Sequence, residues 1–270
     1  MQEYFLKDRG ISYRKNNFVD GRQTLIFVHG VSASSIYWEP YEKKFENSFN
    51  VLSLDLRGHG KSEKFKKYDD YKIKNFADDI YALIFELKIK KPILVCHSFA
   101  TLVALEFMTI HQDLLSGVAL LSPGYFVKKN WLGNFLNFIF SKNLVPLWRW
   151  PKIKGYVDYK KYIGTGDFGL QRVLADLRKT GLRVYFYCIA AMSGFDRKDF
   201  LPQIKIPTTI IHGKKDRYFP VQNGIYMASI IPNCELHLLP KADHIIVLNN
   251  FSEVSEIIDS FAKKIKIDQN

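Results

Sequence analysis

Short apolar runs alternate with amphipathic stretches along most of this chain, and that rhythm predicts a parallel β-sheet covered by helices. The apolar runs lack the polar alternation of a half-buried strand and are typical of strands buried on both faces. They span residues 24–28, 51–55, 93–95, 117–121, 207–211 and 235–239. Helical spacing of apolar residues separates them, at residues 36–45, 75–87, 99–109, 221–230 and 251–265. Before the first run, residues 4–14 alternate around Asp8-Arg9-Gly10 and predict a β-hairpin.

The rhythm of strand and helix stops between residues 124 and 200, where the chain becomes aromatic and basic with helical spacing. Trp131, Phe135 and Phe138 share one face of a helix there. We interpret this stretch as a helical cap inserted into an α/β core formed by residues 1–123 and 201–270. The predicted fold class is therefore a mostly parallel sheet flanked by helices, with a helical cap insertion.

Composition narrows the class of protein. With 47% hydrophobic and 15% aromatic residues, this chain of 270 residues can bury a large core and is not disordered. The formal net charge of +12 is compatible with nucleic acid or an anionic membrane, but no recognition helix, zinc-finger spacing or RNA-binding signature accompanies it. Nucleic acid is therefore not an expected partner.

The targeting and cysteine patterns point to the cytoplasm. Charges interrupt the apolar residues of the N-terminus, and no apolar run approaches the roughly 20 residues that cross a membrane. We therefore expect a soluble, cytoplasmic protein. Its cysteines, at positions 96, 188 and 234, are odd in number and lack CxxC spacing, so they predict small buried residues and not a disulfide framework or a metal site.

Two glycine motifs resemble phosphate-binding loops. Gly60-Lys61-Ser62 matches the end of a P-loop, but Asp55 stands where that motif requires its first glycine, so the motif fails. Residues 164–169 satisfy GxGxxG, which binds a dinucleotide only between a strand and a helix N-terminus. Residues 158–162 do not read as a central strand, and we interpret the motif as a flexible cap loop.

Ser98 is the first candidate for chemistry, because it lies where the buried run at residues 93–95 gives way to a helix. A serine on a sharp, strained strand-to-helix turn exposes its hydroxyl as a nucleophile. Such a turn needs small residues two positions either side, usually glycine, and here they are Cys96 and Ala100. Serine is also a preferred helix N-cap. This segment alone leaves both interpretations open.

Further candidates follow other buried runs: the pair His29-Gly30, then Asp216, then His244. With Ser98 they fall at the carboxyl ends of parallel strands, the edge where open α/β sheets bind ligands. The order serine, aspartate, histidine, with a long insertion before the aspartate, resembles the α/β-hydrolase superfamily over nearly the whole chain. The core most resembles that of the superfamily's serine esterases and lipases.

The resemblance implies a role for each matching position. Ser98 would be the nucleophile, His244 the general base and Asp216 the acid that orients it. The backbone N–H groups of Val31 and Phe99 would form the oxyanion hole. Departures from the family pattern are Cys96 and Ala100 in the turn and Asp243, which stands where a glycine commonly precedes the histidine.

The implied activity is hydrolysis of a carboxylic ester with a hydrophobic acyl group, through an acyl-enzyme on Ser98 and without a metal or organic cofactor. The cap residues Trp131, Phe135 and Phe138 are expected to line the substrate pocket. Carbon–carbon bond hydrolases, thioesterases, perhydrolases and slow-turnover small-ligand receptors have a similar triad and remain open alternatives. A serine argues against the superfamily's epoxide hydrolases and dehalogenases, which carry aspartate at this position.

The charge of the cap raises a question about partners. Residues 124–160 hold seven basic residues and one acidic residue, which is half of the formal net charge of +12. Aromatic residues are interleaved with these charges, a mixture that suits a lid on an anionic lipid surface. Alternatively, the aromatic residues roof an acyl pocket and the lysines face water. The expected partners are a small ester and, peripherally, an anionic membrane; the oligomeric state stays open.

Overall fold

An eight-stranded sheet forms the centre of the protein in a computed structural model, which describes residues 1–129, 131–141 and 154–268. The order of strands across the sheet is β1-β2-β4-β3-β5-β6-β7-β8. β1 and β2 form the expected antiparallel hairpin and β2 pairs antiparallel with β4, whereas the other neighbouring strands are parallel. The strands are β1 (Gln2–Leu6), β2 (Ile11–Lys15), β3 (Thr24–Val28), β4 (Asn50–Leu54), β5 (Ile93–His97), β6 (Gly117–Leu121), β7 (Thr208–Gly213) and β8 (Cys234–Leu239).

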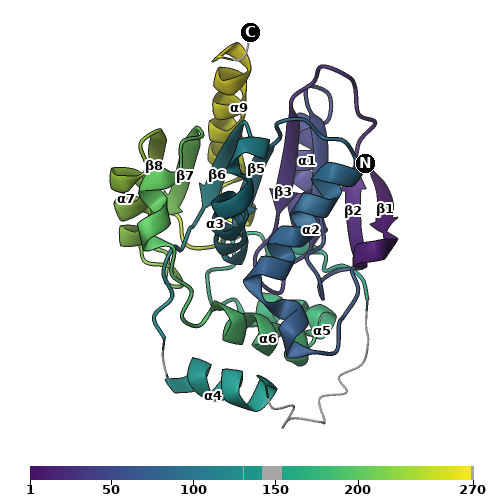
Figure 1. Ribbon diagram of the computed structural model, residues 1–270, viewed down its shortest axis with the longest axis vertical. Helices are drawn as coiled ribbons and strands as arrows, with labels where there is room; N and C mark the ends of the chain where they lie inside the picture. The colour runs from purple at the N-terminus through teal and green to yellow at the C-terminus, as the bar shows by residue number, and fades with distance from the viewer. Residues whose placement is uncertain (130, 142–153, 269–270) are drawn as a thin grey trace.

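Helices cover both faces of this sheet (Figure 1). α2 and α3 pack on one face, and α1 and α9 pack on the other. Every residue of β3, β4, β5, β6 and β7 is consequently buried, which explains why these runs show no polar alternation. The helices are α1 (Glu39–Phe45), α2 (Ile73–Glu86), α3 (Phe99–His111), α4 (Trp131–Ser141), α5 (Leu170–Thr180), α6 (Leu182–Met192), α7 (Val221–Ile230), α8 (Ile246–Asn249) and α9 (Phe251–Asp268).

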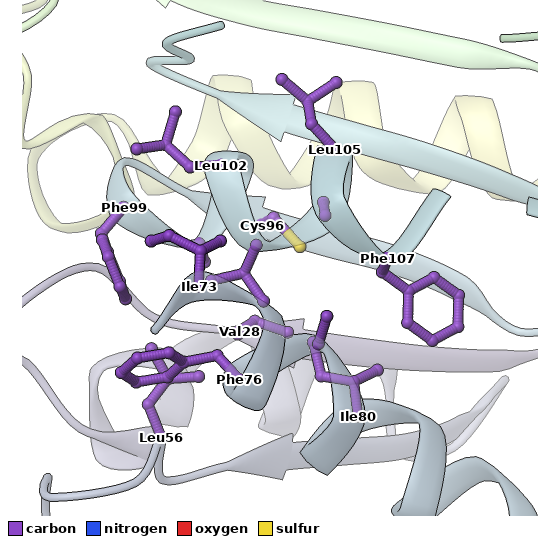
Figure 2. Close-up of a cluster of buried hydrophobic side chains, with 14 of the residues drawn as sticks. Val28, Leu56, Ile73, Phe76, Ile80, Cys96, Phe99, Leu102, Leu105 and Phe107 are labelled. Atoms are coloured by element: carbon purple, nitrogen blue, oxygen red, sulfur yellow. The ribbon is translucent and has the colours of Figure 1, made fainter. Parts of the chain in front are cut away.

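The core between the sheet and the pair α2 and α3 supports the turn that precedes α3 (Figure 2). Phe76 of α2 meets Phe99 of α3 edge to face, with ring centroids 5.1 Å apart, and both rings are fully buried. The sulfur of Cys96, at the end of β5, points into the same apolar cluster. Cys96 and Cys188 are buried as expected, whereas Cys234 is only partly buried.

Three helices between β6 and β7 lie together beyond one end of the sheet, at the bottom of Figure 1. These are α4, α5 and α6, and they fall within the stretch that we interpret as a cap. α4 packs through Leu136 and Phe140, both 8% exposed, with the Phe140 ring 4.8 Å from that of Tyr187 in α6. The division of the chain into a core and a cap remains an interpretation. The helices within the described part of residues 124–200 are observed.

The opposite face of α4 carries the residues that we expect to line the substrate pocket. Trp131, Phe135 and Phe138 share this face, and they are 78%, 53% and 58% exposed. Their place in a substrate pocket stays a prediction. Both faces of α4 carry aromatic residues, and the face that packs on α6 is the one with Leu136 and Phe140.

The aromatic contact beneath the turn predicts a large effect on stability. Replacing Phe76 with alanine removes a fully buried ring, so we expect the free energy of unfolding to fall by about 3–5 kcal/mol. Phe85 is on the same helix but is 73% exposed, and Phe85→Ala should cost far less. Urea denaturation of both variants measures the difference. Equal losses in the two variants would contradict this account of the core.

Candidate active site

The backbone at Ser98 forms a strained turn between β5 and α3. Its φ of 55° and ψ of −121° lie in a region that residues other than glycine rarely occupy. The N–H of Ser98 donates to the carbonyl oxygen of Leu121 at the end of β6, at 3.0 Å. The N–H of Thr101 donates to the Ser98 carbonyl oxygen at 2.8 Å and closes the first turn of α3. The predicted sharp turn is present.

The loop that follows β3 approaches the turn at Ser98 closely, so there is little room for larger residues here. A Cβ atom added to Gly30, just after β3, would lie 3.1 Å from the Ser98 Cβ. Cys96 and Ala100 are fully buried on either side of the serine, so they meet the need for small residues without being glycine. Ser98 itself is only 8% exposed, which differs from the expectation of an exposed hydroxyl.

The three residues of the expected triad form one hydrogen-bonded chain. His244 Nε2 lies 2.7 Å from Ser98 Oγ, and His244 Nδ1 lies 2.7 Å from Asp216 Oδ2. A carboxylate accepts but does not donate, so Nδ1 carries the proton and a neutral His244 accepts the Ser98 hydroxyl proton at Nε2. The three side chains come from loops after β5, β7 and β8. This geometry is suited to removing a proton from Ser98.

Four donors surround the Asp216 carboxylate. Its Oδ1 accepts from the backbone N–H groups of Tyr218 at 2.9 Å and Phe219 at 2.8 Å. Its Oδ2 lies 3.1 Å from His212 Nε2, in addition to His244. Burial alone would raise the pKa of Asp216, but the hydrogen bonds from His212 and His244 outweigh burial and hold that pKa below its usual range. Asp216 is therefore ionised at neutral pH.

His97, immediately before the serine, holds the backbone of His244. Its Nε2 lies 2.9 Å from the His244 carbonyl oxygen, so Nε2 carries the proton and donates. Burial, followed by the nearby His244, lowers the pKa of His97 to about 3, which keeps the ring neutral. The sequence placed His97 in the turn but gave no sign of this contact.

A second residue that the sequence analysis missed is Asp167, in the GxGxxG stretch. Asp167 is 4% exposed, and its Oδ1 accepts from the backbone N–H of His244 at 2.7 Å. A short 3₁₀ helix at Tyr159–Tyr162 precedes the stretch where a dinucleotide fold requires a strand. Gly164 N donates to Asn249 Oδ1 at 2.8 Å, and Asn249 donates back to the Thr165 carbonyl oxygen. The stretch is a loop, as expected, and hydrogen bonds anchor it at Gly164 and Asp167.

The loop after β3 is fixed by a buried histidine. His29 Nδ1 lies 2.7 Å from the Gly30 carbonyl oxygen, and its Nε2 accepts from the Leu56 N–H at 3.0 Å. Burial, and next the neighbouring His59, lowers the pKa of His29 well below its usual value, so the ring stays neutral. Val31 follows this fixed glycine, and Phe99 is the first residue of α3, where a helix leaves N–H groups without intrahelical partners. Their role as an oxyanion hole stays a prediction.

A serine–histidine–aspartate chain at the carboxyl edge of this sheet, with helices on both faces, defines an α/β hydrolase. The chain belongs to the family described as serine aminopeptidase S33, whose model matches residues 20–250. The expected superfamily and fold class are therefore confirmed, and the protein is a hydrolase of that superfamily.

Relatives within this superfamily carry different names. The chain is 25% identical over 262 residues to epoxide hydrolase 3 of Mus musculus, covering 88% of this chain and 70% of that one. It is 25% identical over 269 residues to the uncharacterized hydrolase YugF of Bacillus subtilis, covering 90% and 91%. Because these relatives have different names and are only 25% identical to this chain, they do not identify its substrate.

Solved structures agree in fold. The bromoperoxidase of Bacillus anthracis superposes with a TM-score of 0.74 at 21% identity, covering 94% of this chain and 95% of that one. The enol-lactonase of Burkholderia xenovorans superposes with a TM-score of 0.73 at 20% identity, covering 94% and 96%. At this identity the likeness concerns the fold alone.

The hydrogen-bonded serine leads to a prediction about covalent labelling. We expect a fluorophosphonate probe to label the protein at Ser98, because His244 can take the hydroxyl proton as the oxygen attacks phosphorus. Ser98→Ala should abolish labelling, and Ser252→Ala, at an exposed serine of α9, should leave it unchanged. Mass spectrometry of the labelled peptide identifies the site. A folded wild-type protein that stays unlabelled would mean that Ser98 only caps α3.

Proposed function

We propose that the protein is a serine esterase that cleaves carboxylic esters with a hydrophobic acyl group through an acyl-enzyme on Ser98. The observation that carries the proposal is the pair of 2.7 Å contacts that link Ser98 to His244 and His244 to Asp216. A nucleophile, its base and the group that orients the base are the parts this reaction requires.

The reaction follows from this geometry in two halves. Ser98 Oγ attacks the ester carbonyl carbon while His244 Nε2 takes the hydroxyl proton, and Asp216 stabilises the imidazolium that forms. The N–H groups of Val31 and Phe99 stabilise the oxyanion. His244 then gives its proton to the leaving alkoxide, which departs as the alcohol. Water attacks the acyl-enzyme while His244 takes one of its protons. His244 then returns that proton to Ser98 Oγ as the bond to the acyl carbon breaks, which releases the acid and restores the enzyme.

The hydrophobic acyl group is supported by the surroundings of His244. The ring of Tyr218 lies 5.0 Å from the imidazole centroid and that of Phe219 lies 5.9 Å away. Aromatic rings beside the base offer apolar surface to a substrate group bound there. The exposed residues of α4 do not contribute to this argument.

Epoxide opening is disfavoured by the chemistry of serine, although epoxide hydrolase 3 is among the similar proteins. A carboxylate that opens an epoxide forms an ester, which water can hydrolyse to regenerate the enzyme. A serine hydroxyl would form an ether instead. Water does not cleave an ether under these conditions, so the enzyme would be inactivated after one turn.

A panel of substrates tests the proposed activity. We expect purified protein to hydrolyse p-nitrophenyl esters, with higher kcat/KM for longer acyl chains than for acetate. Asp216→Asn and His244→Ala should each lower kcat by about 10⁴-fold, the typical effect of losing a triad member. His237→Ala, which alters a partly buried histidine on β8 outside the triad, should have no effect.

The same panel separates the alternatives when it includes a thioester, an epoxide and a peracid assay. Faster turnover of the thioester than of the matched ester would favour a thioesterase. Binding of esters without turnover would favour a receptor. Epoxide hydrolysis that survives in Ser98→Ala would overturn the acyl-enzyme proposal, as would a full rate in His244→Ala.

We further propose that the cap binds to the surface of an anionic membrane. The support comes from the exposed face of α4, where Trp131, Phe135 and Phe138 face solvent, and from the exposed Lys128 and Lys129 shortly before this helix in the sequence. Exposed aromatic residues combined with nearby lysines suit the interface of an anionic leaflet. Among the described residues, none of the helices combines the length and the apolar character that spanning a bilayer requires. The contact that we propose is a peripheral one. Trp148, Trp150 and Lys152 lie outside the described residues.

Sedimentation with vesicles tests the membrane contact. We expect binding to anionic but not zwitterionic vesicles, weakened by salt, because each basic residue near an anionic leaflet contributes about 1 kcal/mol. Lys128→Gln with Lys129→Gln should weaken it. The matched control is Lys88→Gln with Lys90→Gln. These exposed lysines follow the C-terminal end of α2, and the length of this helix, about 21 Å, separates them from its N-terminal end, which lies near α4. Absence of binding at low salt would leave the cap without a membrane role.

A further inference from the structure

One carboxylate of the cap region reaches both loops that carry the base and the acid. Asp167 Oδ1 accepts from the backbone N–H of His244 at 2.7 Å, and Asp167 Oδ2 accepts from the backbone N–H of Arg217 at 2.9 Å. Arg217 directly follows Asp216. A single side chain from between β6 and β7 therefore holds the main chain next to two of the three triad residues.

The His244 backbone is held from both sides. Asp167 accepts its N–H, and His97 donates to its carbonyl oxygen at 2.9 Å. Ser122 Oγ is a second donor to the same carbonyl oxygen, at 3.4 Å. With the peptide groups on both sides fixed, the direction of the Cα–Cβ bond is fixed, and with it the point at which Nε2 meets Ser98.

Asp167 is itself held in place by hydrogen bonds to its main chain. Its carbonyl oxygen accepts from Tyr218 Oη at 3.0 Å and from Arg172 Nη2 at 2.9 Å. Arg172, 8% exposed, also faces Asp176 at 3.4 Å, and Asp176 accepts from Tyr159 Oη at 2.8 Å. The carboxylate is thus the end of a polar network that begins inside the cap region.

We infer that Asp167 is a positioning residue for His244 and Asp216, so that the cap region sets the geometry of the triad. This inference rests on the proposed function, since it assigns Asp167 a role in the same reaction. Asp167 touches no reacting atom and acts through the backbone of the two loops. A displacement of His244 by about 1 Å would lengthen the contact with Ser98 beyond hydrogen-bond range and lower the rate by about 100-fold.

Asp167→Asn tests the inference with little change in shape. An amide offers one acceptor oxygen where the carboxylate offers two, and its NH₂ group would face one of the two backbone N–H donors. We expect kcat for p-nitrophenyl acetate to fall about 10- to 100-fold, with KM within a factor of three. A small acyl group is chosen so that contacts between the substrate and the cap contribute little.

The matched control is Asp196→Asn. Asp196 also accepts a backbone N–H, that of Lys198 at 2.9 Å, but it is exposed, and its β-bridge partner is Phe126 and not a triad loop. This variant should keep the kcat of the wild type. Thermal unfolding of both variants shows how much of any loss follows from unfolded protein.

A second readout does not depend on any substrate. The proton on His244 Nδ1, hydrogen-bonded to Asp216, should give a low-field proton resonance that His244→Ala removes. Asp167→Asn should shift or broaden this resonance, whereas Asp196→Asn should not. If the wild type hydrolyses no ester, the proposed function fails, and the resonance still decides whether Asp167 positions the histidine.

The inference is overturned if Asp167→Asn keeps both the wild-type kcat and the wild-type resonance. It is also overturned if the loss of activity only matches the unfolded fraction, which would make the role of Asp167 purely structural. A raised KM with unchanged kcat would likewise overturn it, since Asp167 would then act on substrate binding.

Discussion

Ser98 holds a backbone conformation that costs a residue other than glycine about 1–3 kcal/mol, and it persists only because its surroundings leave no alternative. Three of these surroundings come from distant parts of the chain: the carbonyl oxygen of Leu121, the close approach of Gly30 and the buried contact between Phe76 and Phe99. The strained turn directs the serine oxygen toward His244. The packing of the core therefore determines the position of the nucleophile.

The loops that carry His244 and Asp216 have less strain but depend on more partners. Gly213 shows how closely they pack, because a Cβ atom there would lie 2.4 Å from the Asp243 carbonyl oxygen. His97, His212 and Asp167 then supply hydrogen bonds to the backbone or side chains of the two triad residues. His97 serves here as a fixed neutral donor, because burial lowers its pKa and disfavours the charged ring.

Much of the fold could be predicted from the sequence because the signals are local. The runs at residues 24–28 and 117–121 match β3 and β6 residue for residue, since a strand buried on both faces shows as an unbroken apolar run. The helix expected from residue 36 begins instead at Glu39, because Ser35–Trp38 forms a 3₁₀ turn before it. The triad could be found because its three residues each follow a strand.

What the sequence could not predict depends on contacts between distant residues. Asp167 is 77 positions from His244, and its neighbours along the chain resemble an ordinary glycine-rich loop. The spacing of α4 identified residues that share a face but not the face that turns inward, because Trp131 and Phe140 are equally apolar by type. Only the position of α6 decides that question.

The place of the histidine after β8, 146 residues beyond the serine, also has a consequence for synthesis. At roughly 5–20 residues per second, translation delivers the nucleophile about 7–30 s before the base. Throughout that interval the growing chain carries a serine without a partner to activate it. A polypeptide that has not yet been extended to His244 therefore lacks the base that would activate Ser98.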